Sequence, residues 1–386
     1  MKVLTSALLW LLAIAASAND GVFYVNGSQI VPINETDVAV TKEVLTITLD
    51  NSDYARVDVL YEFTNTGADK VVDMGFEASA PYTPGESNSY KKDFKHPYIY
   101  DFTVTMNGSK LDYKNYLMEQ TVVDEEETHT NFKPIDLKVW ETPSEDEDVS
   151  MLYNSETDKY MSYSYAYVFK GNFKKGKNVV HHTYRYKMSN GVFRCFEVPY
   201  WLLPAMRWAN RQIDDFTLRI VADGTAKQFC LSPDNWTEGE WRVTSGVGKM
   251  HTLENSWCSF LEFSLRNGTY EWHGTNFKPK NNFWIISADN YLFGGEEAPL
   301  LGRFYDRRAG CNYVYATEYD DDGNPINMNT DGLDAKRIMR NLPYAHRGYV
   351  FKDKKLADYF KSLWWYMPDP NWKQSTADFL PGEFLK

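Results

Sequence analysis

The dominant pattern along the chain is an alternation of apolar and polar residues that runs from about Val38 to Gly310. It is clearest in residues 44–49, 55–63, 163–169, 179–186 and 216–220. Alternation with a period of two predicts β-strands that bury one face. Turn-forming pairs such as Asn107-Gly108 separate the strands at hairpin-like intervals. Two polar, proline-containing stretches, Pro81 to Pro97 and Thr121 to Asp158, interrupt the pattern, and we expect them to be long loops.

The strands follow one another without intervening helices, so the sequence predicts a mainly β fold with an antiparallel β-sandwich body. One large sandwich and two sequential sandwiches both fit the pattern. We expect a signal peptide in residues 1–18, a β-sandwich region in residues 19–310, a hairpin or linker in residues 311–328, and a small α-helical C-terminal module in residues 329–386.

Helical periodicity identifies the C-terminal module. Leu356, Tyr359, Phe360 and Leu363 follow the i, i+3, i+4, i+7 spacing of a buried helical stripe, with charged residues between them. A preceding helix should end before Pro343, because the residue before a proline avoids the helical region. The packed centre of the module is expected to contain Tyr344, Gly348, Tyr359, Phe360, Trp365 and Tyr366.

A sequence motif lies in the same segment. Tyr344-Ala345-His346-Arg347-Gly348 is followed by Trp364-Trp365-Tyr366-Met367-Pro368. Together these residues resemble the YARHG domain, an extracellular bacterial module named after its motif. The family order places the arginine before the histidine, whereas His346 and Arg347 are exchanged here. If these two side chains face solvent, they are the candidate binding residues of the module.

A second resemblance concerns the β-region. A strand containing Tyr61-Glu62-Phe63, a tyrosine-rich strand that ends near Gly191, and Val198-Pro199-Tyr200-Trp201 occur in this order. The order is similar to that of an uncharacterised family of secreted bacterial proteins, known only as a domain of unknown function. This resemblance implies an architecture and no established activity.

The first residues are typical of an exported protein. Lys2 precedes an apolar run that ends at Ala16, and Ala16-Ser17-Ala18 provides the small residues of a signal-peptidase site. We expect cleavage near Ala18 and a secreted, periplasmic or extracellular location. No later stretch approaches the roughly 20 apolar residues of a membrane span. The formal net charge of −12 argues against a nucleic-acid partner. A cell-wall glycan or another envelope protein are the partners we consider, and we expect a monomer.

Four cysteines, Cys195, Cys230, Cys258 and Cys311, could form two disulfides in an oxidising compartment, in any of three pairings. The Cys230–Cys258 pair is the first candidate, because these residues flank strands that are expected to be neighbours.

Common catalytic motifs are absent from the sequence: it contains no H-E-x-x-H, G-x-S-x-G or G-x-G-x-x-G. Gly171 to Asn178 fits the start of a phosphate loop, but it ends in asparagine and lies between two predicted strands, so it is better interpreted as a hairpin turn. His181 and His182 are adjacent on a predicted strand, so they point to opposite faces and cannot share one metal ion.

Oxygen-bearing side chains alternate between Glu318 and Asn324. Glu318, Asp320, Asp322 and Asn324, with Gly323, reproduce the start of a calcium loop. The bidentate glutamate that should close such a loop is missing. The tip of a hairpin is therefore the first interpretation, and a calcium site is the alternative. No other cofactor is indicated.

Aromatic residues make up 16% of the chain, and tryptophans are dense between residues 201 and 284. Filling of the core explains most of them, although exposed rings could stack on sugars. The sequence thus predicts a non-catalytic, exported binding or cell-envelope protein. The alternative is an extracellular hydrolase of the glycosidase or peptidase type, whose carboxylates lie far apart in the sequence.

Overall fold

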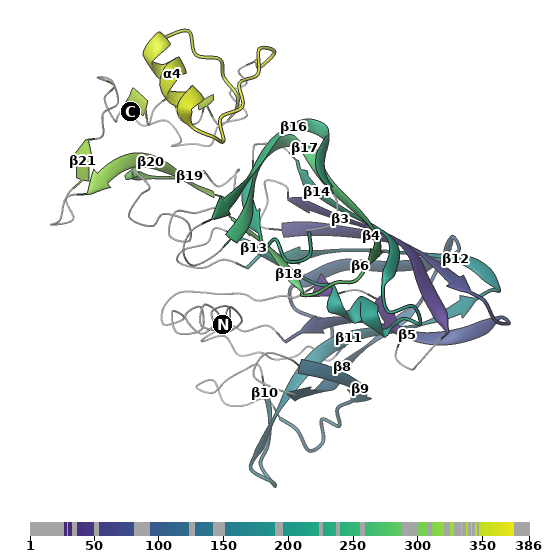
Figure 1. The fold of residues 1–386 in the computed structure, drawn as a ribbon. Helices are drawn as coiled ribbons and strands as arrows, with labels where there is room; N and C mark the ends of the chain where they lie inside the picture. Colours follow the sequence, from purple (N-terminus) through teal and green to yellow (C-terminus); the bar gives the residue numbers. More distant parts are fainter. Residues whose placement is uncertain are drawn as a thin grey trace, which may run out of the picture.

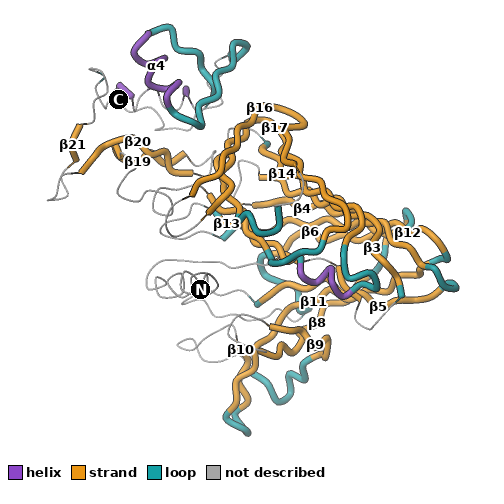
Figure 2. Tube along the Cα trace, in the orientation of Figure 1, coloured by secondary structure: helices purple, strands orange, loops and turns teal. Residues whose placement is uncertain are grey.

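The computed structural model describes residues 27–28, 30–32, 37–49, 54–80, 93–122, 128–141, 151–189, 196–223, 227–236, 240–254, 259–287, 300–306, 311–319, 325–327, 333, 337–338, 341, 344–345 and 347–373. The expected signal peptide and its cleavage site lie outside these residues. Within them the protein is mainly β, with a small helical module near the C-terminus, as predicted (Figures 1 and 2).

Most strands belong to one large sheet, in which twelve strands are described. Its order is β1 (Gly27–Ser28), β13 (Glu197–Trp201), β18 (Phe283–Ser287), β15 (Lys227–Leu231), β17 (Ser259–Phe277), β14 (Ile213–Ala222), β3 (Val38–Leu49), β4 (Tyr54–Asn65), β12 (Gly176–Lys187), β6 (Ile99–Met106) and β7 (Ser109–Lys110), and β16 (Glu240–Glu254) pairs with β17. Neighbours are antiparallel except for the pairs β3–β14 and β1–β13, which are parallel.

A second sheet lies against the large one. Its described strands are β2 (Ile30–Pro32), β5 (Lys70–Ser79), β11 (Lys159–Phe173), β8 (Tyr113–Val122) and β9 (Thr128–Pro134), with β10 (Met151–Asn154) paired to β11. Aromatic rings of the two sheets meet between them. The ring centroid of Phe76 on β5 lies 5.0 Å from that of Phe102 on β6 and 4.8 Å from that of Tyr184 on β12. The two sheets therefore share one apolar core.

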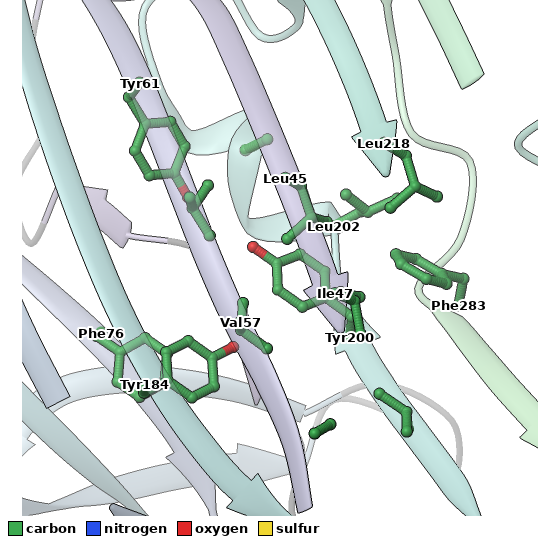
Figure 3. Packing of buried hydrophobic residues seen from close by; sticks show 14 of the residues in the cluster. Leu45, Ile47, Val57, Tyr61, Phe76, Tyr184, Tyr200, Leu202, Leu218 and Phe283 are labelled. Carbon is green, nitrogen blue, oxygen red and sulfur yellow. The ribbon is translucent and has the colours of Figure 1, made fainter. Parts of the chain in front are cut away.

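The alternation in the sequence accounts for this core. On β4, every second residue from Ala55 to Phe63 is apolar and buried, while the residues between them are exposed or half-buried. The neighbouring strands contribute in the same way, so that Leu45, Ile47 and Val57 lie together with Tyr200 and Leu218 (Figure 3). Burial of one face per strand is the main stabilising contribution to such a fold.

The two long loops that we predicted are only partly present. Residues 81–92 lie outside the described residues. Between Thr121 and Asp158, however, β8 continues to Val122 and strands β9 and β10 form, so the loop prediction is wrong there. β9 has few apolar residues and shows no clear alternation in sequence. Its backbone nevertheless pairs with β8, because strand propensity depends on the neighbours that a segment finds.

The described residues of the C-terminal part include three short strands and the helix α4. β19 (Leu300–Asp306), β20 (Cys311–Tyr319) and β21 (Pro325–Asn327) form an antiparallel ribbon. Helix α4 (Lys354–Ser362) begins after Asp353, whose side chain accepts a hydrogen bond from the Leu356 N–H group. In the part of the chain that the structure describes, no helix is long and apolar enough to cross a membrane.

Candidate functional site

The C-terminal module lies near the β16–β17 hairpin of the large sheet (Figure 1) and forms hydrogen bonds with it. Three side chains of this hairpin donate hydrogen bonds to three successive carbonyl groups of the module. Ser264 Oγ donates to Trp365 O over 3.4 Å, Lys249 Nζ to Tyr366 O over 2.8 Å, and Arg266 Nη1 to Met367 O over 2.6 Å. The module is thus bound through its main chain.

The strand alternation of β17 places these donors on one face. Phe263 and Leu265 point into the shared core and are fully buried, so Glu262, Ser264 and Arg266 point the other way. From sequence, these three polar residues would be assigned to solvent. In the structure each is at most 8% exposed, because the module covers this face.

Arg266 lies against the glycine of the motif. Gly348 has a φ of +90°, which a residue with a side chain rarely adopts. A Cβ atom at this position would also collide with Nη1 of Arg266 and would lie 2.6 Å from Cζ and 2.8 Å from Nη2. Both the turn and the neighbouring guanidinium therefore require glycine. The Asp369 N–H group donates to Gly348 O over 2.7 Å and closes this segment.

The charge on Arg266 is partly compensated. Burial lowers the pKa of Arg266, whereas the negative charge of Asp369 raises it. An arginine remains protonated under ordinary conditions despite such a shift. Its Nη2 atom is buried and finds no hydrogen-bond acceptor among the described residues. The guanidinium is therefore held by its packing against Gly348, by the hydrogen bond to Met367 O and by the charge of Asp369, while its Nη2 group makes no hydrogen bond within the described residues.

A second contact joins the hairpin to the module. His251 Nε2 and Glu262 Oε2 are 2.5 Å apart, on paired positions of β16 and β17. The ring of Trp364 stacks on His251, with 4.2 Å between the centroids. Burial raises the pKa of the Glu262 carboxyl, while the hydrogen bond from His251 lowers it.

Another group of buried polar atoms lies between the two sheets. His182 on β12 is fully buried among the rings of Tyr61, Phe102 and Tyr184. Neither ring nitrogen of His182 has a partner among the described residues. Burial lowers the pKa of His182 to about 3, so the imidazole is neutral. His181 points to the opposite face and pairs with Asp58, which confirms the predicted division between the two histidines.

Arg347, one of the two candidate binding residues, is 4% exposed. The condition that this side chain faces solvent is therefore not met: in the turn that leads into Gly348, the side chain packs into the protein. His346 lies outside the described residues. A binding role for either residue stays a prediction.

The proposed calcium loop falls mostly outside the described residues, which exclude Asp320, Asp322 and Asn324. Glu318 lies on β20, opposite Ile326 of β21, in an antiparallel pair, as expected for strands that flank a hairpin tip. Calcium binding stays a prediction. Within the described ranges, no three His, Cys, Asp or Glu residues come together as a metal site.

The tryptophans and cysteines have different outcomes. Trp208, Trp236 and Trp272 are at most 4% exposed, so core filling is confirmed for them. Cys230 is buried on β15, which pairs with β17 as expected. Cys195 and Cys258 lie outside the described residues, and the disulfide pairing stays a prediction. Residues 174–175 connect β11 to β12, but these two strands belong to different sheets and do not pair with each other. The predicted hairpin turn is therefore wrong: the connection crosses from the second sheet to the large one.

Sequence reasoning missed Lys249, His251, Glu262 and Arg266 as a group. Their common role depends on which segment covers the outer face of β17, and alternation alone does not reveal this. The one available signal was the glycine of the motif, because a glycine can indicate close approach of another group as well as a turn.

Comparison with known proteins identifies the module. Residues 326–378 match the family model of the YARHG domain, so the C-terminal module is a YARHG domain, as the motif indicated. The comparison with curated proteins finds no match.

Three of the solved structures that resemble the chain are distant likenesses. A protein from Legionella pneumophila, described as a putative nutrient binding protein, is 16% identical, with 93% of this chain and 97% of that chain covered at a TM-score of 0.48. An M1 zinc metallopeptidase from Deinococcus radiodurans is 7% identical, with coverages of 62% and 42% and a TM-score of 0.21. Leukotriene A4 hydrolase from Saccharomyces cerevisiae is 10% identical, with coverages of 61% and 29% and a TM-score of 0.22. These likenesses are too distant to assign a function.

Proposed function

We propose that this chain is an exported, non-catalytic binding protein of the bacterial cell envelope, in which the β-sheet body holds the YARHG domain in a fixed position. The observation that carries this proposal is the row of three hydrogen bonds from the β16–β17 hairpin to successive module carbonyls. A module held by its main chain keeps its outer side chains available for a partner. The YARHG domain is of the extracellular type, which supports export.

The outer side of the module suggests the chemistry of the partner. Lys352, Lys354, Lys355 and Lys361 are exposed around α4, next to Asp353 and Asp358. This surface has more basic than acidic residues although the whole chain carries a net charge of −12. A locally basic surface on an acidic protein attracts an anionic polymer to that surface specifically, because the rest of the protein repels it. We therefore propose a cell-wall glycan with carboxylate groups as the first partner, and another envelope protein as the second.

Co-sedimentation of the purified protein with peptidoglycan and with insoluble polysaccharides tests this proposal. The parent protein should sediment with peptidoglycan, less at high salt because salt screens exposed charges. The double variant Lys352→Glu/Lys361→Glu should sediment several-fold less. A matched control is Lys110→Glu/Lys175→Glu, which makes the same charge change at exposed positions of the β-sheet body. No sedimentation with any glycan would reject the cell-wall version and leave a protein partner.

A hydrolase is the second candidate, and one observation favours it. Glu262 combines a raised carboxyl pKa with a direct contact to His251, and shifted pKa values gather at catalytic sites. The stacked ring of Trp364 covers this pair from the module side. A screen with glycoside and peptide substrates decides: turnover that Glu262→Gln abolishes would establish the hydrolase, whereas turnover unaffected by Glu262→Gln would clear this pair of a catalytic role.

A further inference from the structure

We propose that the YARHG domain contains a binding site for a guanidinium group, formed by Gly348 and the segment from Tyr366 to Asp369, and that Arg266 of the same chain is its resident occupant. The ligand class is thus the arginine side chain. This site is separate from the basic outer surface of the module, so its test does not depend on the proposed partner.

The position of the guanidinium relative to Gly348 gives the first argument. A Cβ atom on Gly348 would meet Nη1, Cζ and Nη2 of Arg266 together. All three atoms lie within 2.8 Å of that point, so the guanidinium packs directly against the glycine. A lysine ammonium is a compact group on a flexible stem and cannot reproduce this contact.

Hydrogen bonding and charge give the second argument. Met367 O accepts from Nη1 over 2.6 Å, and the charge of Asp369 favours the protonated guanidinium. The Asp369 N–H bond to Gly348 O, 2.7 Å long, holds the two sides of the site together. The space beside Gly348, which a side chain would fill, a main-chain acceptor and a nearby carboxylate match the size, the donors and the positive charge of the guanidinium.

Arg266 does not use all of its hydrogen-bond donors in this site. Arg266 is 6% exposed, yet its Nη2 atom finds no acceptor among the described residues. A buried donor without a partner is unfavourable. The resident contact is thus weaker than the site allows, and a small guanidinium compound that can keep its remaining donors in water should compete for the same place.

Chemical rescue of Arg266→Ala in the full chain tests the proposal. The amide of Asp369 reports on the site, and its hydrogen exchange should accelerate about tenfold to a hundredfold, since a hydrogen bond to a charged group is lost. Millimolar methylguanidinium should restore slow exchange, whereas methylammonium should not. Arg242→Ala is the control, because Arg242 lies on the same hairpin and pairs with Glu271 instead, so the exchange at Asp369 should stay at the parent rate.

A second variant shows where the rescue acts. In Arg266→Ala/Gly348→Ala, a Cβ atom takes up part of the site, so methylguanidinium should no longer restore exchange. Should Arg266→Ala fail to fold, Arg266→Lys decides, because it keeps the charge and loses the flat group: rapid exchange at Asp369 supports the site. Parent-like exchange in either single variant, or equal rescue by methylguanidinium and methylammonium, would overturn the proposal.

Discussion

At the scale of single residues, two buried histidines differ in how their nitrogens are satisfied. His96 Nε2 lies 3.0 Å from Ser79 O, and the Tyr98 N–H group donates to Nδ1 over 3.1 Å. This arrangement fixes one neutral tautomer. His182 has no such partners among the described residues and is held by aromatic rings alone. Burial lowers the pKa of both histidines to about 3.

We expect His182→Phe to make the protein less sensitive to acid. The unfolded chain binds a proton near pH 6.5 and the folded chain only near pH 3, so protonation favours unfolding between these values. The free energy of unfolding should fall by about 1.4 kcal/mol per pH unit for this group as the pH drops through that window. Urea unfolding of parent and variant between pH 7 and pH 4 measures the difference.

The control for that experiment is His96→Phe. It removes a second group with the same low pKa, but it leaves Ser79 O and the Tyr98 N–H group without their partners. It should cost about 1–3 kcal/mol already at pH 7, whereas His182→Phe should cost little there. If parent and His182→Phe lose stability equally with acid, the imidazole of His182 is not buried and neutral.

The histidines also show what a sequence can predict at this scale. Adjacent positions on a strand must point to opposite faces, so the different environments of His181 and His182 follow from alternation. The contact partners of the other histidines do not follow from alternation. His251 contacts Glu262 and His273 contacts Asp215, each on another strand, while Glu271, which is close to His273 in sequence, pairs with Arg219 and Arg242. Strand pairing between distant segments decides such contacts.

At the scale of elements, helix α4 depends on its buried stripe. Leu356 and Phe360 are buried, and the rings of Phe360 and Phe351 stack with centroids 4.7 Å apart. The i, i+3, i+4, i+7 spacing predicted this stripe. The expected packed centre is confirmed for Phe360 and Tyr366, which are buried, and for Tyr344, Tyr359 and Trp365, which pack against them partly buried.

Replacement of Phe360 by alanine should open the module. Loss of a buried phenylalanine costs about 3–5 kcal/mol, which is a large share of the stability of so small a unit. A protease of broad specificity should then cut the module of Phe360→Ala faster than that of the parent, as mass spectrometry of the fragments would show. Lys361→Ala, an exposed change on the same helix, should remain as resistant as the parent. Equal resistance of both variants would mean that Phe360 is not a core residue.

Strands were predictable where one face is apolar, as on β3, β4 and β14. Strand β9 was missed because its pattern is polar, and β10 because four residues give too short a period to recognise. The contact between the β16–β17 hairpin and the C-terminal module was not predictable from the sequence of the hairpin or of the module alone. It requires knowing that Lys249 and Arg266 face the same side of a hairpin and that the module carbonyls meet them there.

At the scale of the whole molecule, the two sheets share one core, and Trp208 connects them. Its ring centroid lies 4.4 Å from that of Phe63 on β4 and 6.3 Å from that of Phe173 on β11. We expect the two sheets to unfold in one cooperative transition. Trp208→Ala should lower the free energy of opening by about 3–5 kcal/mol in both sheets.

Native-state hydrogen exchange distinguishes the two sheets in that experiment. Amides of β4 report on the large sheet and amides of β11 on the second sheet, and both sets should lose protection together in Trp208→Ala. Leu60→Ala, a change at a position that is 37% exposed on β4, is the control and should leave both sets nearly unchanged. Loss of protection in β4 alone would mean that the sheets are separate folding units.

The parallel pair β3–β14 has a consequence for how the chain is made. β3 lies in the middle of the large sheet, between β4, which follows it directly, and β14, where Phe216 pairs with Glu43. During synthesis the β3–β4 hairpin can form early, but the other edge of β3 must wait until residue 222 is available. Until then it presents unpaired backbone groups next to apolar side chains, which is a template for association with another chain. Newly made protein is therefore most vulnerable to aggregation before β14 arrives, and any release of incomplete chains ending ahead of residue 213 would produce the form most prone to it.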